Sequence, residues 1–190
     1  MQIILASRSP RRAGLLKKII SDFEIIPSSV NEEKIKEKDP IKFALQAAEL
    51  KAKDVGTRHP QAIVIGADTI VVLEGKIFGK PKDPEDAKKI LKMLSGKTHQ
   101  VISGIAVYKK DESKLISAYE STDVAFKVLS DKEIEDYIKK ETVHDKAGSY
   151  AIQDIGDRFI KGIKGDYDNV VGLPVNLVKK LLKSFRSCLQ

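Results

Sequence analysis

Apolar residues recur at helical spacing in three segments that each open with a capping residue and a proline. Ser9, Asp39 and Asp83 stand directly before that proline, an order typical of the first helical turn, where a missing N–H leaves nothing unpaired. The predicted helices begin at Pro10, run from Pro40 to about Lys53, and run from Pro84 to about Leu94, where Ser95-Gly96 ends the last of them. In the second helix, the residues predicted to face the core are Phe43, Ala44, Ala47 and Leu50.

Two more helices are predicted in the second half of the chain. Ser130 and Glu133 have the spacing of a capping box, which opens a helix that continues to about Lys140. The last helix follows Pro174 and is amphipathic, with an apolar side formed by Val175, Leu177, Val178, Leu181 and Leu182.

Short apolar runs predict strands at residues 3–6, 62–65, 70–73, 77–78, 101–108, 115–128, 149–152 and 159–163. The runs 62–65 and 70–73 are predicted as two separate strands on either side of the segment that contains Asp68. Because helices and strands alternate and hairpins are mixed in, we predict an α/β fold with a mixed, twisted sheet flanked by helices. We expect a single domain over residues 1–190, arranged as two lobes around a cleft.

The composition is that of a globular protein, since 42% of the 190 residues are hydrophobic, enough for one full core. No segment approaches the roughly 18 uninterrupted apolar residues of a membrane helix, and the N-terminus has no signal-peptide pattern. The single cysteine, Cys188, cannot form an internal disulfide. These features predict a cytoplasmic protein with no membrane partner.

Positive charge exceeds negative charge, with 34 Lys and Arg against 27 Asp and Glu. A positive field attracts polyanions, so nucleic acids and nucleotides are both admissible partners. The chain has no Trp and only 6% aromatic residues, which leaves little material for stacking on the bases of a single strand. Small anionic substrates are therefore favoured over a stable nucleic-acid partner.

The segment from Ser7 to Arg12 joins the first predicted strand directly to the first helix. A helix N-terminus presents unpaired N–H groups and the positive end of the helix dipole, and both attract an anion. Arg11 and Arg12 lie in the same turn, where a basic residue lowers helix stability unless an external negative charge compensates it. This conflict points to a ligand that carries phosphate. The alternative is a plain strand–helix turn with two solvated arginines.

Three other charged residues stand in unusual surroundings. Asp68 lies within an apolar segment, and it is predicted either to pair with a lysine as a structural acid or, at a strand end, to bind a metal ion or activate water. Lys80 is held between Gly79 and Pro81, which a lysine needed only for solubility does not require. Lys51 lies among alanines and either reaches into a cleft or extends its charged end back to solvent.

The sequence lacks the residue patterns of several other kinds of functional site. His59, His99 and His144 have neither metal-ligand spacing nor cysteine companions, which argues against a structural zinc site. Ser7 is not in a nucleophile elbow, and there is no Walker A or G-x-G-x-x-G motif. Several Lys and Arg with one or two carboxylates are what phosphoryl or nucleotidyl transfer requires, where charge neutralisation and positioning do most of the catalysis.

Six ordered blocks, which run through nearly the whole chain, resemble the Maf family of nucleoside triphosphate pyrophosphatases. The blocks are Leu5-Ala6-Ser7-x-Ser9-Pro10-Arg11-Arg12, Gly66-Ala67-Asp68-Thr69, Gly79-Lys80-Pro81, Leu94-Ser95-Gly96-x-x-His99-x-Val101, Asp145-Lys146-Ala147-Gly148-x-Tyr150-x-Ile152-Gln153, and Gly165-Asp166-Tyr167 through Gly172-Leu173-Pro174. The resemblance implies a Maf/ITPase-like fold, hydrolysis of a nucleoside triphosphate to the monophosphate and pyrophosphate, a divalent metal cofactor (Mg²⁺ or Mn²⁺), and a homodimer.

The resemblance also implies roles for single residues. Asp68 matches the proposed proton acceptor of the family. Glu32, together with Asp68, matches the acids expected to hold the metal, although Glu33 beside it leaves the register open. The positions that match phosphate-contacting residues are Ser7, Arg11, Arg12, Lys51 and Lys80.

Three positions report the substrate branch within this family. Arg11, Thr69 and Gln153 resemble the branch that acts on dTTP and UTP, whereas the branch that prefers 7-methylguanosine triphosphate has Trp, Gln and Glu there. A glutamine offers a donor and an acceptor to a pyrimidine edge. Two alternatives stay open: a purine-directed pyrophosphatase acting on inosine or xanthosine triphosphate, and a non-catalytic basic protein that regulates cell division or contacts nucleic acid.

Overall fold

The computed structural model describes residues 2–141, 143 and 146–187. His144, Asp145 and Cys188 lie outside the described residues, and with them the predictions that involve these three positions. The chain forms two compact units. Unit 1 comprises Met1–Thr69, Ser103–Glu120 and Gly172–Gln190, and unit 2 comprises Ile70–Ile102 and Ser121–Val171.

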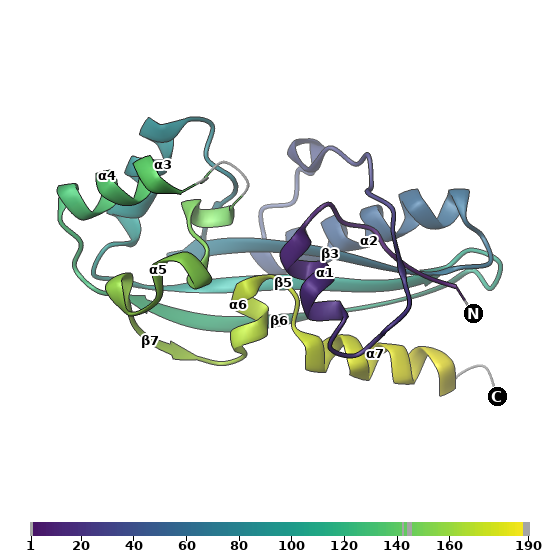
Figure 1. The fold of residues 1–190 in the computed structure, drawn as a ribbon. Coiled ribbons are helices and arrows are strands. Elements are labelled where there is room, and N and C mark those ends of the chain that lie inside the picture. Colours follow the sequence, from purple (N-terminus) through teal and green to yellow (C-terminus); the bar gives the residue numbers. More distant parts are fainter. Residues whose placement is uncertain (1, 142, 144–145, 188–190) are drawn as a thin grey trace. The chain divides into compact units, whose positions relative to one another are not determined.

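The strands of the described residues form one mixed sheet (Figure 1). Its order is β2 (Glu24–Ile25), β1 (Ile3–Leu5), β3 (Ile63–Leu73), β5 (Thr98–Lys109), β6 (Lys114–Phe126) and β7 (Ile160–Lys164), and β4 (Lys76–Phe78) pairs with β3. β1 runs parallel to β2 and β3, whereas β4 is antiparallel to β3 and β7 is antiparallel to β6. The prediction of an α/β fold with a mixed sheet flanked by helices is confirmed.

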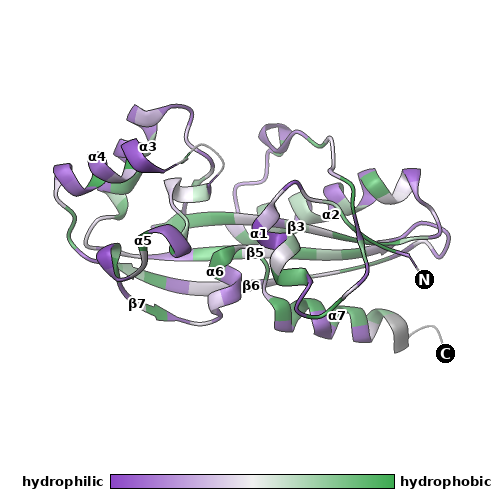
Figure 2. Cartoon of the chain, viewed as in Figure 1, coloured by the Kyte–Doolittle hydropathy of each residue, from purple (hydrophilic) through white to green (hydrophobic). Residues whose placement is uncertain are grey.

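Unit 1 contains the helices α1 (Pro10–Leu16), α2 (Pro40–Arg58) and α7 (Val175–Ser187), and the short 3₁₀ helix η1 (Glu32–Lys34). The predicted caps are formed, since the Ser9 side chain accepts the Arg12 N–H and the Asp39 side chain accepts the Lys42 N–H. α2 continues beyond its predicted end near Lys53. α7 is amphipathic as predicted, and apolar and polar segments alternate along its ribbon (Figure 2).

α2 packs on the sheet through alanine rather than through large side chains. Ala48 and Ala52 are fully buried, whereas Leu50 is 38% exposed and Phe43 is half-buried. The prediction that Leu50 faces the core was therefore wrong, whereas Ala44 and Ala47 are fully buried as predicted. The reason is the close approach of helix and strand: a Cβ built on Gly66 would lie 2.2 Å from the Ala48 carbonyl oxygen, so only small residues fit this contact.

β3 is one continuous strand of 11 residues, and Asp68 lies within it with 4% of its surface exposed. The prediction of two separate strands with Asp68 at a strand end was wrong. A charged residue interrupts the apolar run in the sequence, but it does not interrupt the strand, because another element supplies its partner.

Unit 2 contains α3 (Pro84–Leu94), α4 (Asp131–Lys140), α5 (Ile152–Phe159), α6 (Tyr167–Val171) and the 3₁₀ helix η2 (Ala147–Ser149). α3 has its predicted limits, and α4 begins with the predicted capping box. The predicted strand over 149–152 was wrong, because this segment ends η2 and begins α5. Gly148 and Ser149 both have φ of 66°, in the left-handed region, which an extended strand cannot contain.

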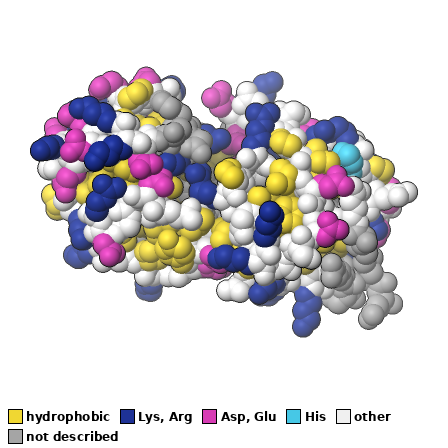
Figure 3. Space-filling view, viewed as in Figure 1, with side chains coloured by type: hydrophobic (Ala, Val, Ile, Leu, Met, Phe, Trp, Pro, Cys, Tyr) yellow, Lys and Arg dark blue, Asp and Glu magenta, His cyan; other side chains and the backbone are white. Residues whose placement is uncertain are grey.

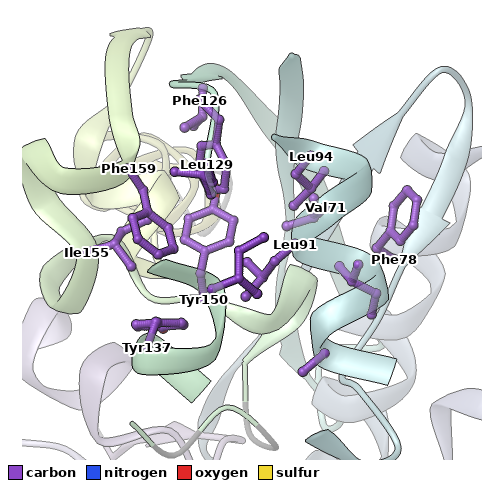
Figure 4. Close-up of a cluster of buried hydrophobic side chains, with 14 of the residues drawn as sticks. Val71, Phe78, Leu91, Leu94, Phe126, Leu129, Tyr137, Tyr150, Ile155 and Phe159 are labelled. Atoms are coloured by element: carbon purple, nitrogen blue, oxygen red, sulfur yellow. The ribbon is translucent and has the colours of Figure 1, made fainter. Parts of the chain in front are cut away.

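The core of unit 2 is a cluster of aromatic and aliphatic side chains (Figure 4). The Phe126 ring makes edge contacts with Tyr150 and Phe159, at centroid distances of 5.0 Å and 6.2 Å. Tyr137 lies 5.3 Å from Phe159, and His99 lies 4.8 Å from Phe126. Aromatic pairs in such geometries add to the free energy gained from burial alone. This cluster therefore holds α4 and α5 on the strands of unit 2.

Lys and Arg are interspersed with Asp and Glu on the visible face of each unit (Figure 3). On unit 2, Lys88 pairs with Glu135 and Lys92 pairs with Asp131, which joins α3 to α4. Exposed pairs of this kind contribute little to stability. Among the residues that the structure describes, no helix combines the length and hydropathy that crossing a bilayer requires.

Candidate functional site

Asp68 lies in the interior of unit 1, where β3 passes α2. Its Oδ1 accepts a hydrogen bond from Lys51 Nζ at 2.6 Å. Its Oδ2 is buried and has no hydrogen-bond partner within the described part of the chain. A buried carboxylate oxygen without a partner is unfavourable, so it marks a position where a ligand or cation would be stabilising.

Lys51 reaches Asp68 from α2, and the same ammonium meets a second carboxylate. Its Nζ lies 2.6 Å from Asp68 Oδ1 and 2.5 Å from Glu32 Oε1. The side chains of Lys51 and Asp68 are 10% and 5% exposed, whereas that of Glu32 is 37% exposed. Removing one member of a buried pair typically costs about 3–5 kcal/mol, so the link to Asp68 has the larger effect on stability. Lys51 thus turns inward rather than back to solvent.

The structure distinguishes the two neighbouring acids that the sequence left open. Glu32 begins η1 and places its carboxylate against Lys51. Glu33 is exposed, and its backbone N–H donates to the Asn31 side chain at 2.9 Å. Glu32 is therefore the acid that shares the Lys51 ammonium with Asp68.

Asp54 ties the loop before η1 to α2. Its carboxylate accepts hydrogen bonds from the Ser29 N–H at 2.9 Å and from the hydroxyls of Ser28 and Ser29 at 3.0 Å and 3.2 Å. Burial raises the pKa of Asp54, but these hydrogen bonds and the charge of Arg58 outweigh it and hold the pKa below its ordinary value. Since Asp54 follows Lys51 by three residues, one helix positions both the loop and the lysine.

Arg12 reaches from α1 to β3 and to the chain at Gly172. Its Nη1 donates to the Ala67 carbonyl at 3.0 Å, its Nη2 to Thr69 Oγ1 at 3.0 Å, and its Nε to the Gly172 carbonyl at 2.9 Å. Burial of the guanidinium lowers the pKa of Arg12, and the two nearby carboxylates partly oppose this by favouring the charged form. This arginine is therefore engaged with the protein itself.

Ser7 and Arg11 lie beside Arg12. Ser7 is 7% exposed, and its Oγ accepts hydrogen bonds from the Ser9 N–H at 3.2 Å and from Arg12 Nη1 at 3.3 Å. Arg11 is half-buried in the first turn of α1. The structure thus gathers most of the predicted site in unit 1: Ser7, Arg11, Arg12, Glu32, Lys51, Asp68 and Thr69.

Lys80 and Gln153 belong to unit 2. Lys80 is exposed in the loop after β4, and Gln153 is exposed at the second position of α5. The Gly148 N–H donates to the Gly79 carbonyl at 3.0 Å, which ties the loop of Lys80 to η2. Both side chains are thus available on the surface of their own unit.

Two supporting residues of unit 1 were missed in the sequence. Ser103 is fully buried, and its Oγ lies 2.9 Å from Thr69 Oγ1. The sequence feature that could have revealed Ser103 is its hydroxyl within an apolar strand, because a buried hydroxyl needs a hydrogen-bond partner. Asp54 had no such signal, because an aspartate on an exposed helix face is common.

The donor set of unit 1 fits a hard divalent cation. Glu32 and Asp68 supply carboxylate oxygens, and the Asp68 Oδ2 atom has no partner among the described residues. Within the same residues there is no group of three or more His, Cys, Asp or Glu side chains that could hold a metal ion. Mg²⁺ is commonly held by one or two carboxylates together with water and substrate phosphates. This pair therefore suits a cation that arrives with a phosphate ligand.

A family model described as Maf-like protein matches residues 2–185 of the chain. The chain belongs to the Maf family. A dTTP/UTP pyrophosphatase of Pyrococcus furiosus is 50% identical over 182 residues, which cover 96% of this chain and 94% of that protein. The dTTP/UTP pyrophosphatase of Ruminiclostridium cellulolyticum is 49% identical, over 95% of this chain and 94% of that protein. The resemblance of the six sequence blocks to Maf proteins is confirmed.

The Maf chain also resembles a solved structure outside these relatives. The Staphylococcus aureus Ham1 protein aligns with a TM-score of 0.55 over 97% of this chain and 99% of that chain. The sequences are 15% identical, so the likeness concerns the fold alone. It agrees with the mixed α/β architecture of the Maf chain.

Proposed function

We propose that this Maf chain is a nucleoside triphosphate pyrophosphatase that hydrolyses dTTP and UTP, with modified pyrimidine nucleotides as further candidates. The observation that carries the proposal is the pair of carboxylates, Asp68 and Glu32, around the ammonium of Lys51. The relatives named dTTP/UTP pyrophosphatase support the choice of substrate, because they match nearly the full length of the chain.

In the proposed reaction, water attacks the α-phosphorus in line with the departing pyrophosphate. A new O–P bond forms while the bond to the oxygen bridging the α- and β-phosphates breaks, and pyrophosphate leaves with the bonding electrons. Asp68 accepts the proton of the attacking water through its carboxylate. The groups proposed to neutralise the phosphate oxygens are Ser7, Arg11, Lys51 and Lys80.

Asp68 and Glu32 would hold the divalent cation, Mg²⁺ or Mn²⁺. When bound, such a cation neutralises phosphate charge and polarises phosphoryl oxygens. Lys51 Nζ lies 2.5 Å and 2.6 Å from oxygens of these two carboxylates, so the ammonium competes for them. An ammonium that yields them turns its N–H donors toward the phosphates.

Arg11, Thr69 and Gln153 are the proposed determinants of the pyrimidine branch. Gln153 carries the clearest chemical argument, because its exposed amide can donate to and accept from a pyrimidine edge. A glutamate at that position only accepts, and it would suit a base edge that presents N–H groups.

The test of the proposal is pyrophosphate release across dTTP, UTP, the purine triphosphates and modified nucleotides, with Mg²⁺, Mn²⁺ or a chelator. We expect dTTP and UTP to rank first, and Asp68→Asn to lower kcat by at least about 100-fold while the fold stays intact by circular dichroism. Gln153→Glu should weaken use of dTTP and UTP more than it weakens folding. Preference for inosine or xanthosine triphosphate would favour the purine alternative, and DNA binding without turnover would favour the regulator.

Glu32 and Glu33 form a matched pair for testing the metal site. Glu32→Gln should raise the Mg²⁺ concentration needed for half-maximal activity by about 10-fold or more, because one carboxylate ligand is lost. Glu33→Gln removes an equal charge from the adjacent exposed position and should leave this concentration unchanged. Titration of Mn²⁺ binding by calorimetry checks the same ranking without turnover. Equal effects of the two substitutions would contradict the assignment of Glu32.

The cytoplasm is the proposed location, because nucleoside triphosphates are made and consumed there. A homodimer is the proposed assembly, by resemblance to the family. The proposed activity requires neither a nucleic-acid partner nor a membrane.

A further inference from the structure

β1 ends before β3 does, so the part of β3 that carries Asp68 has no partner from β1 on that side. β1 ends at Leu5, which pairs with Ile65, and the Ala6 N–H donates to the Ile65 carbonyl at 2.8 Å. Carbonyl groups two residues apart in a strand point to the same side. The Ala67 carbonyl therefore points to the same side as β1, but β1 has ended before it reaches this level.

The Arg12 guanidinium binds this part of β3. Its Nη1 donates to the Ala67 carbonyl at 3.0 Å, and its Nη2 donates to Thr69 Oγ1 at 3.0 Å. Lys51 Nζ also approaches the Ala67 carbonyl, but at 3.5 Å, the upper limit for a hydrogen bond. Arg12 thus holds the residue before Asp68 and the residue after it.

Further contacts fix the guanidinium itself. Its Nε donates to the Gly172 carbonyl at 2.9 Å, and its Nη1 lies 3.3 Å from Ser7 Oγ. Thr69 Oγ1 in turn lies 2.9 Å from Ser103 Oγ and 3.3 Å from the Gly172 carbonyl. These acceptors all belong to the protein, and they engage Nε and both terminal nitrogens.

We infer that Arg12 is a positioning residue that holds the residues on both sides of Asp68, through the Ala67 carbonyl and the Thr69 hydroxyl, rather than one of the groups that contact the triphosphate. The inference rests on the proposed pyrophosphatase activity, and it changes the role that the family resemblance implied for this arginine. The guanidinium donates from three nitrogens spread over a rigid plane, whereas the three N–H donors of a lysine ammonium all leave one atom and cannot span the same acceptors.

Steady-state kinetics with dTTP and Mg²⁺ separate positioning from substrate binding. Arg12→Lys keeps the positive charge but loses the planar set of guanidinium N–H donors. We therefore expect kcat to fall about 100-fold while KM changes by less than about threefold. Arg12→Gln should lower kcat as far, because charge alone does not hold the strand. Arg8→Gln removes an exposed arginine from the same loop and should keep both constants. If Arg12→Lys keeps kcat and raises KM, the arginine contacts the triphosphate and the inference is wrong.

Hydrogen exchange of the full chain, followed by mass spectrometry, tests the same inference without turnover. In Arg12→Lys, exchange at residues 66–70 should become about tenfold faster, because hydrogen bonds from a charged donor are lost on both sides of Asp68. Exchange in α3, which belongs to unit 2, should not change. Unchanged exchange at residues 66–70 would overturn the inference.

A second pair of variants covers the case in which the Arg12 variants do not fold. Thr69→Val removes the hydroxyl that accepts from Arg12, and Thr69→Ser keeps it. We expect Thr69→Val to lose more of kcat and to exchange faster at residues 66–70 than Thr69→Ser. Equal kcat and equal exchange in the two variants would overturn the inference. A wild-type protein that releases no pyrophosphate from any nucleotide would instead overturn the proposed activity, and the exchange measurements would still decide the role of Arg12 in holding β3.

Discussion

Buried polar side chains occur in both units, and their partners decide what each of them can do. In unit 1, Asp68 pairs with Lys51 through Oδ1 and keeps Oδ2 without a partner in the described residues. In unit 2, His99 Nε2 lies 2.7 Å from the Tyr150 hydroxyl, and its buried Nδ1 has no partner in the same set of residues. Asp68 stands among the cations expected to meet phosphate, whereas His99 is enclosed by the aromatic core. The proposed role of the first is therefore catalytic, whereas we expect the second to affect stability.

Burial lowers the pKa of His99 from 6.5 to about 4. Below pH 6.5 the unfolded chain takes up a proton at this position and the folded chain does not, so the free energy of unfolding falls between pH 6.5 and about pH 4. We expect His99→Gln to remove up to about 3 kcal/mol of this dependence, measured by urea unfolding across the pH range. Tyr150→Phe keeps the imidazole buried and should retain it. A pH dependence that is the same in wild type and His99→Gln would contradict this prediction.

At the scale of helices and strands, α2 lies closer to β3 and β5 than the sequence alone indicated. A Cβ on Gly104 of β5 would lie 2.2 Å from the Ala44 carbonyl oxygen of α2. The same distance separates a Cβ on Gly66 of β3 from the Ala48 carbonyl. Because α2 carries Lys51, the depth at which this helix lies on β3 and β5 sets how far the ammonium reaches toward Asp68.

Gly104→Ala should lower the free energy of unfolding by about 2–3 kcal/mol, because backbone atoms of α2 must move away from the added methyl group. Gly14→Ala is the matched control: Gly14 lies in α1, and a Cβ added there would meet nothing within 4 Å, so the change should stabilise the helix by about 0.5–1 kcal/mol. Denaturant unfolding of the two variants measures both values. Equal stability of Gly104→Ala and the wild type would show that α2 does not lie as close to β5 as described.

Over the full chain, the formal net charge is +7, although acidic residues are interspersed among the basic ones on the face that Figure 3 shows. Pairs such as Lys97 with Glu74 and Lys109 with Glu112 neutralise part of the lysine excess locally. The remaining positive field favours the approach of polyanions, and it acts over distances that salt shortens.

Raising the salt concentration from about 50 mM to about 200 mM should therefore raise KM for dTTP several-fold while kcat stays within about twofold. Inhibition by the product dTMP, which carries less charge, should depend less on salt. Initial rates at each ionic strength measure both effects. A KM for dTTP that does not respond to salt would show that the net charge plays no part in substrate capture.

Short-range signals along the chain account for much of the architecture. The starts of α1, α2 and α3 follow from a capping residue and a proline, and the start of α4 follows from its capping box. These rules involve residues within one turn of each other, so no distant part of the chain can easily overrule them. For the same reason, the alternation of helices and strands sufficed to predict a mixed α/β sheet.

Where long-range contacts decide, the sequence was ambiguous or misleading. β3 continues through Asp68 because Lys51 compensates the carboxylate from 17 residues away. Leu50 is exposed because the close fit of α2 on β3 admits only small residues. Arg12, which the chain presented as a cation for phosphate, is engaged by carbonyls and hydroxyls of segments up to 160 residues distant.

The order of residues thus settled which types of side chain are available and where helices begin, since propensity and capping act locally. The tertiary structure settled which partners those side chains have, which of the two acids Glu32 and Glu33 meets Lys51, and which carboxylate oxygen of Asp68 is left without a partner in the described chain. Burial and pairing across the fold depend on all the packed elements at once, and no local pattern contains that information.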